Sequence, residues 1–196
     1  MLREGTPEAS VRLRLRGWRE GDRAVLRRLN SDPRVMRFFP ALLTAEESDG
    51  FWLRMRAHQH RHGYSLWAVE EKQGAFVGLV GLAQVGDAMP CAPAVEIGWR
   101  LLPEYWGKGY ATEAAQQALA FGFQVCGLRE IVAFTAALNL PSRKVMERLS
   151  MHHDLADDFD HPRLPKNHAL APHVLYRLPV ALFQPVQADF LATRWM

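Results

Sequence analysis

Two glycines lie in a short loop between an extended run of residues and an alanine-rich helical pattern. The extended run covers residues 95–102, Gly107 and Gly109 flank Lys108 in the loop, and the helical pattern begins at Tyr110. The first turn of a helix carries unpaired N–H groups and the positive end of the helix dipole, so it attracts anions. Glycine has no Cβ atom, which lets an anion approach these N–H groups closely. The segment therefore predicts a phosphate or pyrophosphate site built from backbone donors.

Three kinds of phosphate site compete for this loop. A nucleotide P-loop requires Gly-x-x-x-x-Gly-Lys followed by Ser or Thr, and the segment 107–109 has neither the spacing nor the hydroxyl. A dinucleotide fingerprint requires a third Gly or Ala where this chain has Thr112, and an acid at the end of the next strand, where it has Thr135. The third kind is the pyrophosphate site of an acyl-CoA enzyme, in which the ligand also lies along the preceding strand.

Hydrophobic periodicity predicts the elements that must position this loop. Val11, Leu13 and Leu15 alternate with arginines as in a half-exposed strand, and residues 44–47, Thr-Ala-Glu-Glu, form the capping box of a helix. In chain order we expect a strand at 11–16, helices at 22–30 and 44–63, strands at 64–70, 76–85 and 95–102, a helix at 110–125, a strand at 131–135, a helix at 141–149 and a strand at 173–180. This pattern is typical of one mixed α/β domain over residues 1–196, with a core at about 10–180 and a tail at 181–196.

Composition and charge favour a soluble intracellular protein. The chain has 24 Lys and Arg against 21 Asp and Glu, a net charge of +3, and its basic residues are interspersed with acids, which argues against nucleic acid as a partner. No signal peptide is predicted, and the longest apolar run, 74–83, is too short for a bilayer, which requires roughly 20 residues. We therefore expect no membrane partner. Cys91 and Cys126 are predicted to be reduced and buried, as in a cytoplasmic protein.

Three motifs together resemble a known family. Residues 96–101 read Glu-Ile-Gly-Trp-Arg-Leu, residues 106–114 read Trp-Gly-Lys-Gly-Tyr-Ala-Thr-Glu-Ala, and residues 139–142 read Asn-Leu-Pro-Ser. In this order and spacing they are similar to the GNAT superfamily of N-acetyltransferases, and most similar to its RimJ/RimL-like branch, which includes acetyltransferases of ribosomal-protein N-termini. The resemblance covers most of the chain, from Arg12 to about Leu178. It implies a single-domain GNAT-like α/β fold with a mixed, mostly antiparallel sheet flanked by helices.

The resemblance also implies which residues contact acetyl-CoA, the co-substrate of this family. By this match the CoA-binding residues are Leu101, Leu102, Trp106, Gly107, Lys108, Gly109, Tyr110, Ala111, Thr112, Asn139 and Ser142. Within this set, the positions 107–111 match the loop that grips the pyrophosphate. Leu101 and Leu102 match positions whose backbone meets the pantetheine arm, and Asn139 and Ser142 match positions beside the thioester. The resemblance implies no metal.

The chain departs from the family pattern at three positions. Trp106 stands where many members have Arg or Gln, and Ser150 replaces a glycine that usually ends the following helix. Met146 stands where many members have a tyrosine general acid. We therefore assign the donation of a hydrogen bond to the leaving sulfur to Ser142. The alternative is that Ser142 only caps the helix that begins at Pro141.

Acetyl transfer requires a base, because an amine arrives as an ammonium ion, and Glu96 is the first candidate. It lies on the strand just before the predicted CoA-binding segment. The alternative is a structural ion pair with Arg100, which lies two pleats along on the same face. A second candidate base is an acidic loop, for which the alternative is a solvated turn before a proline. This loop contains Asp157, Asp158, Asp160 and His161.

Three further features each have a structural and a functional interpretation. His58 and His62 are one helical turn apart, as metal ligands can be, but they lack a clear third ligand, so a solvated helix end is favoured. Tyr176 on the last strand either faces the site or packs with its hydroxyl at the surface. The apolar tail, 181–196, either covers its own domain or crosses to a second subunit in a homodimer.

The sequence thus predicts an acetyl-CoA-dependent N-acetyltransferase that moves an acetyl group to a primary amine. The acceptor is a protein N-terminus or a small-molecule amine, and the reaction is a direct attack in a ternary complex. The missing tyrosine leaves open a non-catalytic CoA-binding sensor, and transfer of another acyl group such as succinyl is a further alternative.

Overall fold

The computed structural model describes residues 5–185, and one eight-stranded sheet forms its middle layer. The strand order is β1-β2-β3-β4-β5-β8-β6, with β7 paired to β8. The strands are β1 (Leu13–Arg16), β2 (Leu66–Glu71), β3 (Phe76–Gln84), β4 (Val95–Leu101), β5 (Glu130–Ala136), β6 (His152–His153), β7 (Phe159–Asp160) and β8 (Pro172–Pro179). Only β4 and β5 are parallel, and every other pair in the sheet is antiparallel. The predicted mixed, mostly antiparallel sheet is confirmed.

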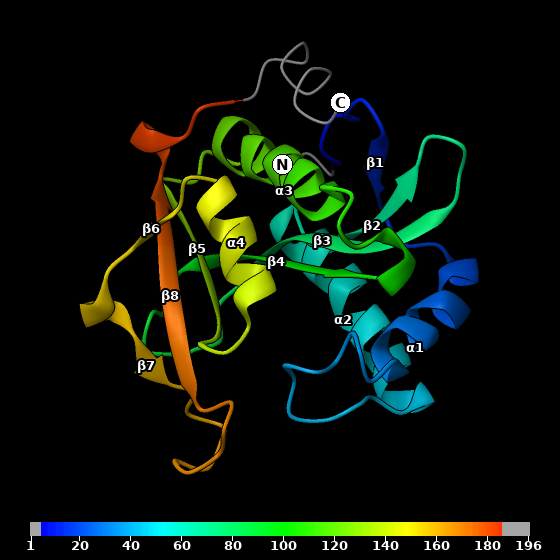
Figure 1. Cartoon of the computed structure of the whole chain (residues 1–196). Helices are drawn as coiled ribbons and strands as arrows, with labels where there is room; N and C mark the ends of the chain where they lie inside the picture. Colours follow the sequence, from blue (N-terminus) through cyan, green and yellow to red (C-terminus); the bar gives the residue numbers. More distant parts are fainter. Residues whose placement is uncertain (1–4, 186–196) are drawn as a thin grey trace.

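Helices cover both faces of this sheet. The helices α3 (Tyr110–Ala120) and α4 (Leu140–Arg148) lie together on one face, and α1 (Arg23–Ser31) and α2 (Ala45–His62) pack on the other (Figure 1). Alternating strand residues divide the core accordingly: Trp67, Val80 and Leu82 belong to the cluster beneath α3 and α4, whereas Ala68 and Leu79 belong to the one beneath α1 and α2. Within residues 5–185, no helix has both the length and the apolar composition that crossing a membrane requires.

The predicted start of α2 is confirmed in detail. The Thr44 Oγ1 atom accepts a hydrogen bond from the Glu47 N–H at 3.2 Å, and the Glu47 carboxylate accepts one from the Thr44 N–H at 2.8 Å. The helix ends at Gly63, whose φ of 79° is left-handed and therefore suits glycine. The helix predicted for 110–125 is α3 continued by a π-helix, Phe121–Val125.

The sheet opens between its two parallel strands. Over their lengths β4 and β5 pair at one position, Glu96 with Val132. Just outside the two ends of β4, the Ala94 carbonyl accepts from the Val85 N–H at 2.9 Å and the Leu102 N–H donates to the Val77 carbonyl at 3.0 Å, both on the side of β3. Since backbone groups alternate along a strand, those of Trp99 and Leu101 point toward β5, beyond the last paired position. Beyond that pair the two strands separate (Figure 1), and the gap between them is faced by the backbone of Trp99 and by the N–H of Leu101, whose carbonyl accepts from the Trp106 indole N–H.

Only the beginning of the predicted C-terminal tail lies within the described residues. A short 3-10 turn, Val180–Leu182, follows β8, and the ring of Phe183 packs 4.9 Å from that of Phe123. This contact agrees with docking onto the chain's own core at that point. The rest of the tail, 186–196, lies outside the described residues.

Candidate active site

The predicted anion site lies where α3 begins. Gly109 is the N-cap residue with a φ of 76°, and Gly107 has a φ of 74°. Both values are left-handed, so the loop requires glycine at both positions. No side chain of residues 5–185 accepts a hydrogen bond from the first-turn N–H groups as a cap. A Cβ atom at Gly107 would meet nothing within 4 Å, so the loop is open on its outer side.

Three side chains of this loop have different surroundings. Trp106 is 48% exposed, and its indole N–H donates to the Leu101 carbonyl at 2.8 Å. Lys108 is exposed, and its Nζ lies 5.2 Å from the centre of the Tyr105 ring, which leaves an ammonium beside the helix start. Tyr110 instead turns inward, and its hydroxyl donates to Glu71 Oε1 at 2.5 Å. Of the Tyr110 groups, only the backbone N–H is therefore placed for the predicted contact with pyrophosphate.

The two next residues of α3, Ala111 and Thr112, are partly buried, and Ala111 packs against the main core. They lie in the first turn of the helix, which agrees with backbone contacts to an anion there.

The backbone of Leu102, which was predicted to meet the pantetheine arm, is already hydrogen-bonded within the chain. Its N–H already donates to the Val77 carbonyl, and its carbonyl accepts from Tyr105, both at 3.0 Å. The backbone groups that point into the gap belong to Trp99 and Leu101 instead.

The start of α4 corrects one of the alternatives for Ser142. Asn139 caps this helix, since its Oδ1 accepts from the Ser142 N–H at 3.3 Å while its Nδ2 donates to Thr135 Oγ1 at 2.8 Å. The Ser142 hydroxyl is therefore not the cap, and it has no hydrogen-bond partner among residues 5–185. Met146 is 2% exposed and belongs to the core, so it contributes no proton donor.

Glu96 lies on the sheet face opposite α3 and α4. It is partly buried, and within the described part of the chain its carboxylate makes neither an ion pair nor a hydrogen bond. The structural alternative, an ion pair with Arg100, is therefore wrong, because Arg100 turns to the Oδ1 of Asn30 on α1. Burial raises the pKa of Glu96 to about 7. A carboxyl group with this pKa can take up and release a proton near neutral pH, as a general base must.

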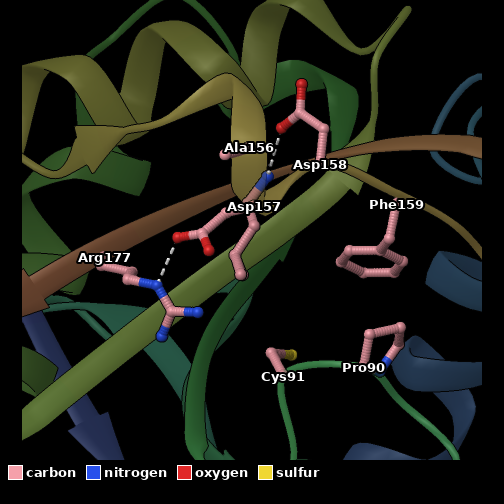
Figure 2. Close-up of a pocket in the computed structure, with 8 residues that line it drawn as sticks. Pro90, Cys91, Ala156, Asp157, Asp158, Phe159 and Arg177 are labelled. Carbon is pink, nitrogen blue, oxygen red and sulfur yellow. Dashed lines mark hydrogen bonds and ion pairs between the residues drawn. The ribbon is translucent and has the colours of Figure 1, made fainter.

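The acidic loop lines a cleft of about 220 Å³ on the same face as Glu96. The register aligns Glu96, Val132 and Arg177 across β4, β5 and β8, so their side chains share this face. The cleft residues are Pro90, Cys91, Ala156, Asp157, Asp158, Phe159, Leu175 and Arg177, with the first two facing the others (Figure 2). The sequence places none of these loops side by side. Their proximity follows from the order of the strands.

Two carboxylates of this loop, those of Asp157 and Asp158, are paired with neighbouring groups although both remain partly exposed. Asp157 accepts a hydrogen bond from Arg177 Nε at 2.6 Å, and this contact lowers the pKa of Asp157 (Figure 2). Asp158 lies 2.8 Å from His153 Nε2 and accepts from the Leu175 N–H at 3.2 Å. A carboxylate paired with a cation is a weaker base than an unpaired one. Glu96 is therefore the better candidate.

The other members of the acidic loop lie outside this cleft. Asp160 is exposed and lines a second hollow of about 340 Å³ together with Phe159 and His173. The Nδ1 atom of His161 accepts from the Arg163 N–H at 3.2 Å. The structure thus brings Asp157 and Asp158 together in the cleft on the face that carries Glu96, places Asp160 beside Asp158 in the second hollow, and has His161 in neither.

The predicted solvated helix end at His58 is also wrong. The His58 Nδ1 lies 2.9 Å from the Tyr64 carbonyl, and its Nε2 accepts from the Gln84 N–H at 3.0 Å. Both ring nitrogens are thus used to tie α2 to the sheet, which leaves none for a metal. Burial lowers the pKa of His58 and keeps the ring neutral.

The burial and partners of four other side chains can be compared with the sequence. Cys91 and Cys126 are free thiols, but they are partly buried rather than buried, and burial raises the pKa of each. Tyr176 is 3% exposed, and its hydroxyl lies 3.4 Å from Glu147. Sequence analysis missed Glu113, which is buried and binds Ser10 Oγ at 2.6 Å. The only signal for it was an acid within the apolar stripe of α3.

Comparisons with known proteins agree with this arrangement. Residues 12–152 match the family model described as an acetyltransferase (GNAT) domain. The chain is 31% identical over 144 residues to the uncharacterized protein YkkB of Bacillus subtilis. The matched region covers 72% of this chain and 83% of that protein. A GNAT-family acetyltransferase from Bacillus anthracis superposes with a TM-score of 0.73 at 26% identity, covering 89% of this chain and 98% of that one.

A second solved structure extends the likeness of the fold. RimJ of Mycobacterium smegmatis, in complex with CoA-disulfide, has a TM-score of 0.71 at 21% identity, with 94% of this chain and 92% of that chain covered. Since the family model spans most of the sheet and both glycines of the loop, the chain belongs to the GNAT acetyltransferase family. It is an N-acetyltransferase.

Proposed function

We propose that this protein transfers the acetyl group of acetyl-CoA to a primary amine by direct attack within a ternary complex. The observation that carries this proposal is the arrangement around β4. An open helix start lies beyond its end on one side of the sheet, and an unpaired carboxylate with a raised pKa lies on the other side. The gap between β4 and β5 joins the two sides.

Acetyl-CoA fits the residues on the α3 side. The first-turn N–H groups of α3, the open surface at Gly107 and the exposed ammonium of Lys108 suit a pyrophosphate. The backbone of Trp99 and the N–H of Leu101 offer strand-like partners to the amides of pantetheine, while the Leu101 carbonyl is bound by the Trp106 indole. The thioester then lies in the gap, where Asn139 and Ser142 begin α4.

Glu96 removes a proton from the incoming ammonium, directly or through a water molecule. The amine nitrogen then forms a bond to the thioester carbonyl carbon, and the carbon–sulfur bond breaks. Backbone N–H groups at the gap stabilise the negative charge that develops on the carbonyl oxygen. Ser142 donates a hydrogen bond to the departing sulfur, which leaves as a thiolate and takes up a proton. The products are an N-acetylated acceptor and free CoA.

Glu96→Gln is the test of this proposal. We expect kcat to fall about 100-fold, because general base catalysis contributes roughly that much or more, while the affinity for acetyl-CoA stays unchanged. In the wild type, kcat/KM should rise as the pH increases through about 7, because the base acts only when it is deprotonated. In Glu96→Gln, this rise of kcat/KM with pH should be absent.

Asp157→Asn is the matched control for the other candidate base. It removes a carboxylate from the same face, but one that Arg177 already pairs, so the pH profile should keep its shape. If the rise of kcat/KM with pH were absent in Asp157→Asn but present in Glu96→Gln, the base would belong to the acidic loop.

The buried Met146 stands where the family resemblance implies a tyrosine, so the proposed transfer calls for a direct test. Release of free thiol from acetyl-CoA in the presence of a panel of amines and peptides measures the transfer. Binding of acetyl-CoA without thiol release on any acceptor would contradict the proposal. The same assay with succinyl-CoA in place of acetyl-CoA tests which acyl group is transferred. The molar mass in solution, measured by light scattering, tests whether the protein is a homodimer.

A further inference from the structure

The most unusual charge near the proposed acceptor side is that of Arg100. It lies on β4 two pleats beyond Glu96, on the same face, with Gly98 between them. The two Cα atoms are about 13 Å apart at the rise of an extended strand. A Cβ atom at Gly98 would meet only Leu66 Cδ2, at 3.7 Å, so the space above this part of the strand is not needed for packing.

The guanidinium of Arg100 has no carboxylate partner among residues 5–185. Its Nη1 donates to the Oδ1 of Asn30, and its Nε is buried without a partner. The Cζ atom lies 4.2 Å from the centre of the Phe39 ring. Nη2 makes no hydrogen bond to a described residue, and Arg100 is partly rather than fully buried. The cation is thus held in place but electrically unpaired.

Arg16 is another largely buried arginine, but unlike Arg100 it has carboxylate partners. Its side chain is 12% exposed and binds two carboxylates, Asp22 at 2.7 Å and Glu70 at 2.6 Å, which raise its pKa. Burial without such a partner instead lowers the pKa of Arg100 to about 10, so it remains charged at neutral pH. Burying an unpaired charge is unfavourable, and a fold retains it where a ligand completes the pair.

Asn30 and two aromatic rings hold the guanidinium of Arg100 in position. Asn30 is fully buried, and its Nδ2 donates to Ser48 Oγ at 2.9 Å, which orients its Oδ1 toward the guanidinium. The Cζ atom also lies 5.6 Å from the centre of the Phe51 ring, and the Arg100 side chain as a whole is partly buried rather than fully enclosed. A planar guanidinium held in this way matches a carboxylate, which it can bind through two hydrogen bonds.

We infer that the acceptor carries a carboxylate in addition to its amine, and that Arg100 binds this carboxylate while Glu96 faces the amine. This inference rests on the proposed function and narrows its acceptors to the amino acid class. The glycine between the two charged residues leaves room for the acceptor to lie along β4. Asn30 is a positioning residue, because it acts through Arg100.

The test compares acceptors that differ only in the carboxylate. Amino acids are each paired with their carboxamides, and straight-chain ω-amino acids with the alkylamines of the same length. We expect the wild type to favour the carboxylate member of at least one pair by about 10- to 100-fold in kcat/KM, since charge-assisted hydrogen bonds have about this effect. Arg100→Gln should remove this preference by raising the acceptor KM, without a change in acetyl-CoA affinity.

Arg56→Gln is the matched control, because Arg56 is exposed on α2 and stacks on Trp52 at 4.5 Å. It should retain the preference. If Arg100→Gln fails to fold, the wild-type preference still decides the matter. Acetyl transfer to amines with no preference for any carboxylate, or an equal loss for both members of a pair in Arg100→Gln, would overturn the inference. No transfer to any amine would instead overturn the proposed function.

Discussion

The starts of α2 and α3 are built in opposite ways. Thr44 and Glu47 satisfy each other's backbone N–H groups at the start of α2, whereas α3 begins at Gly109 with no cap from any side chain of residues 5–185. Both helices have an acid in the first turn. Glu47 closes its own helix, but Glu113 points away to Ser10 and Arg12. A helix start that its own side chains complete is structural, and one left open is available to a ligand.

Of the substitutions at these two helix starts, Gly109→Glu should have the largest effect, on the affinity for acetyl-CoA. A carboxylate at the open start of α3 would occupy the place of the pyrophosphate and repel it, so the Kd for acetyl-CoA should rise about 100-fold or more. Calorimetry measures this directly. Gly74→Glu is the control, because Gly74 also has a left-handed φ, 98°, but lies in the β2–β3 turn. Equal losses in both variants, or no loss in either, would contradict the assignment.

Glu113→Ala tests the acid that does not cap its helix. Its carboxylate accepts from the Arg12 N–H at 3.0 Å and from Arg12 Nε at 2.7 Å, so its removal leaves buried donors unpaired. We expect the free energy of unfolding to fall by about 3 kcal/mol, measured by urea denaturation. Acetyl-CoA should still bind the folded variant at low temperature. A change in affinity larger than the change in stability would mean that Glu113 supports the site directly.

Thr44→Ala should have the smallest effect. Loss of one N-cap hydrogen bond costs about 1 kcal/mol of stability, and the affinity for acetyl-CoA should not change. The thermal midpoint and the Kd of the same preparation give both values. Weaker binding in this variant would show that the two helix starts are coupled, and would remove the distinction between a structural and a binding terminus.

Local patterns predicted most of the fold and the loop of the site. The capping box at Thr44 and the two glycines of the loop are short motifs whose geometry depends on neighbouring residues, and both were found as expected. The interactions that depend on residues distant in sequence were not predictable. Arg100 binds Asn30, from a helix much earlier in the chain, and His58 bonds to Gln84. No spacing in the sequence indicates either contact.

The acceptor side of the site illustrates the same limit. Glu96 was predictable as a carboxylate near the CoA segment, but not as one without a partner. Its isolation depends on where the side chain of Arg100 goes, which periodicity along β4 does not determine. The cleft that contains Asp157 depends on β8 lying beside β5, a pairing of strands far apart in the chain.

The single pair between Glu96 and Val132 divides the sheet into two blocks, β1 to β4 and β5 to β8, joined at one point. Amide protons on the two sides of this seam beyond that pair lack strand partners, so they should exchange with deuterium far faster than those of β3. A ligand that bridges the seam would slow this exchange without contacting the core. The backbone amides of Trp99 and Leu101 therefore offer a built-in report of occupancy, which mass spectrometry can follow on peptides from β4 without any acceptor.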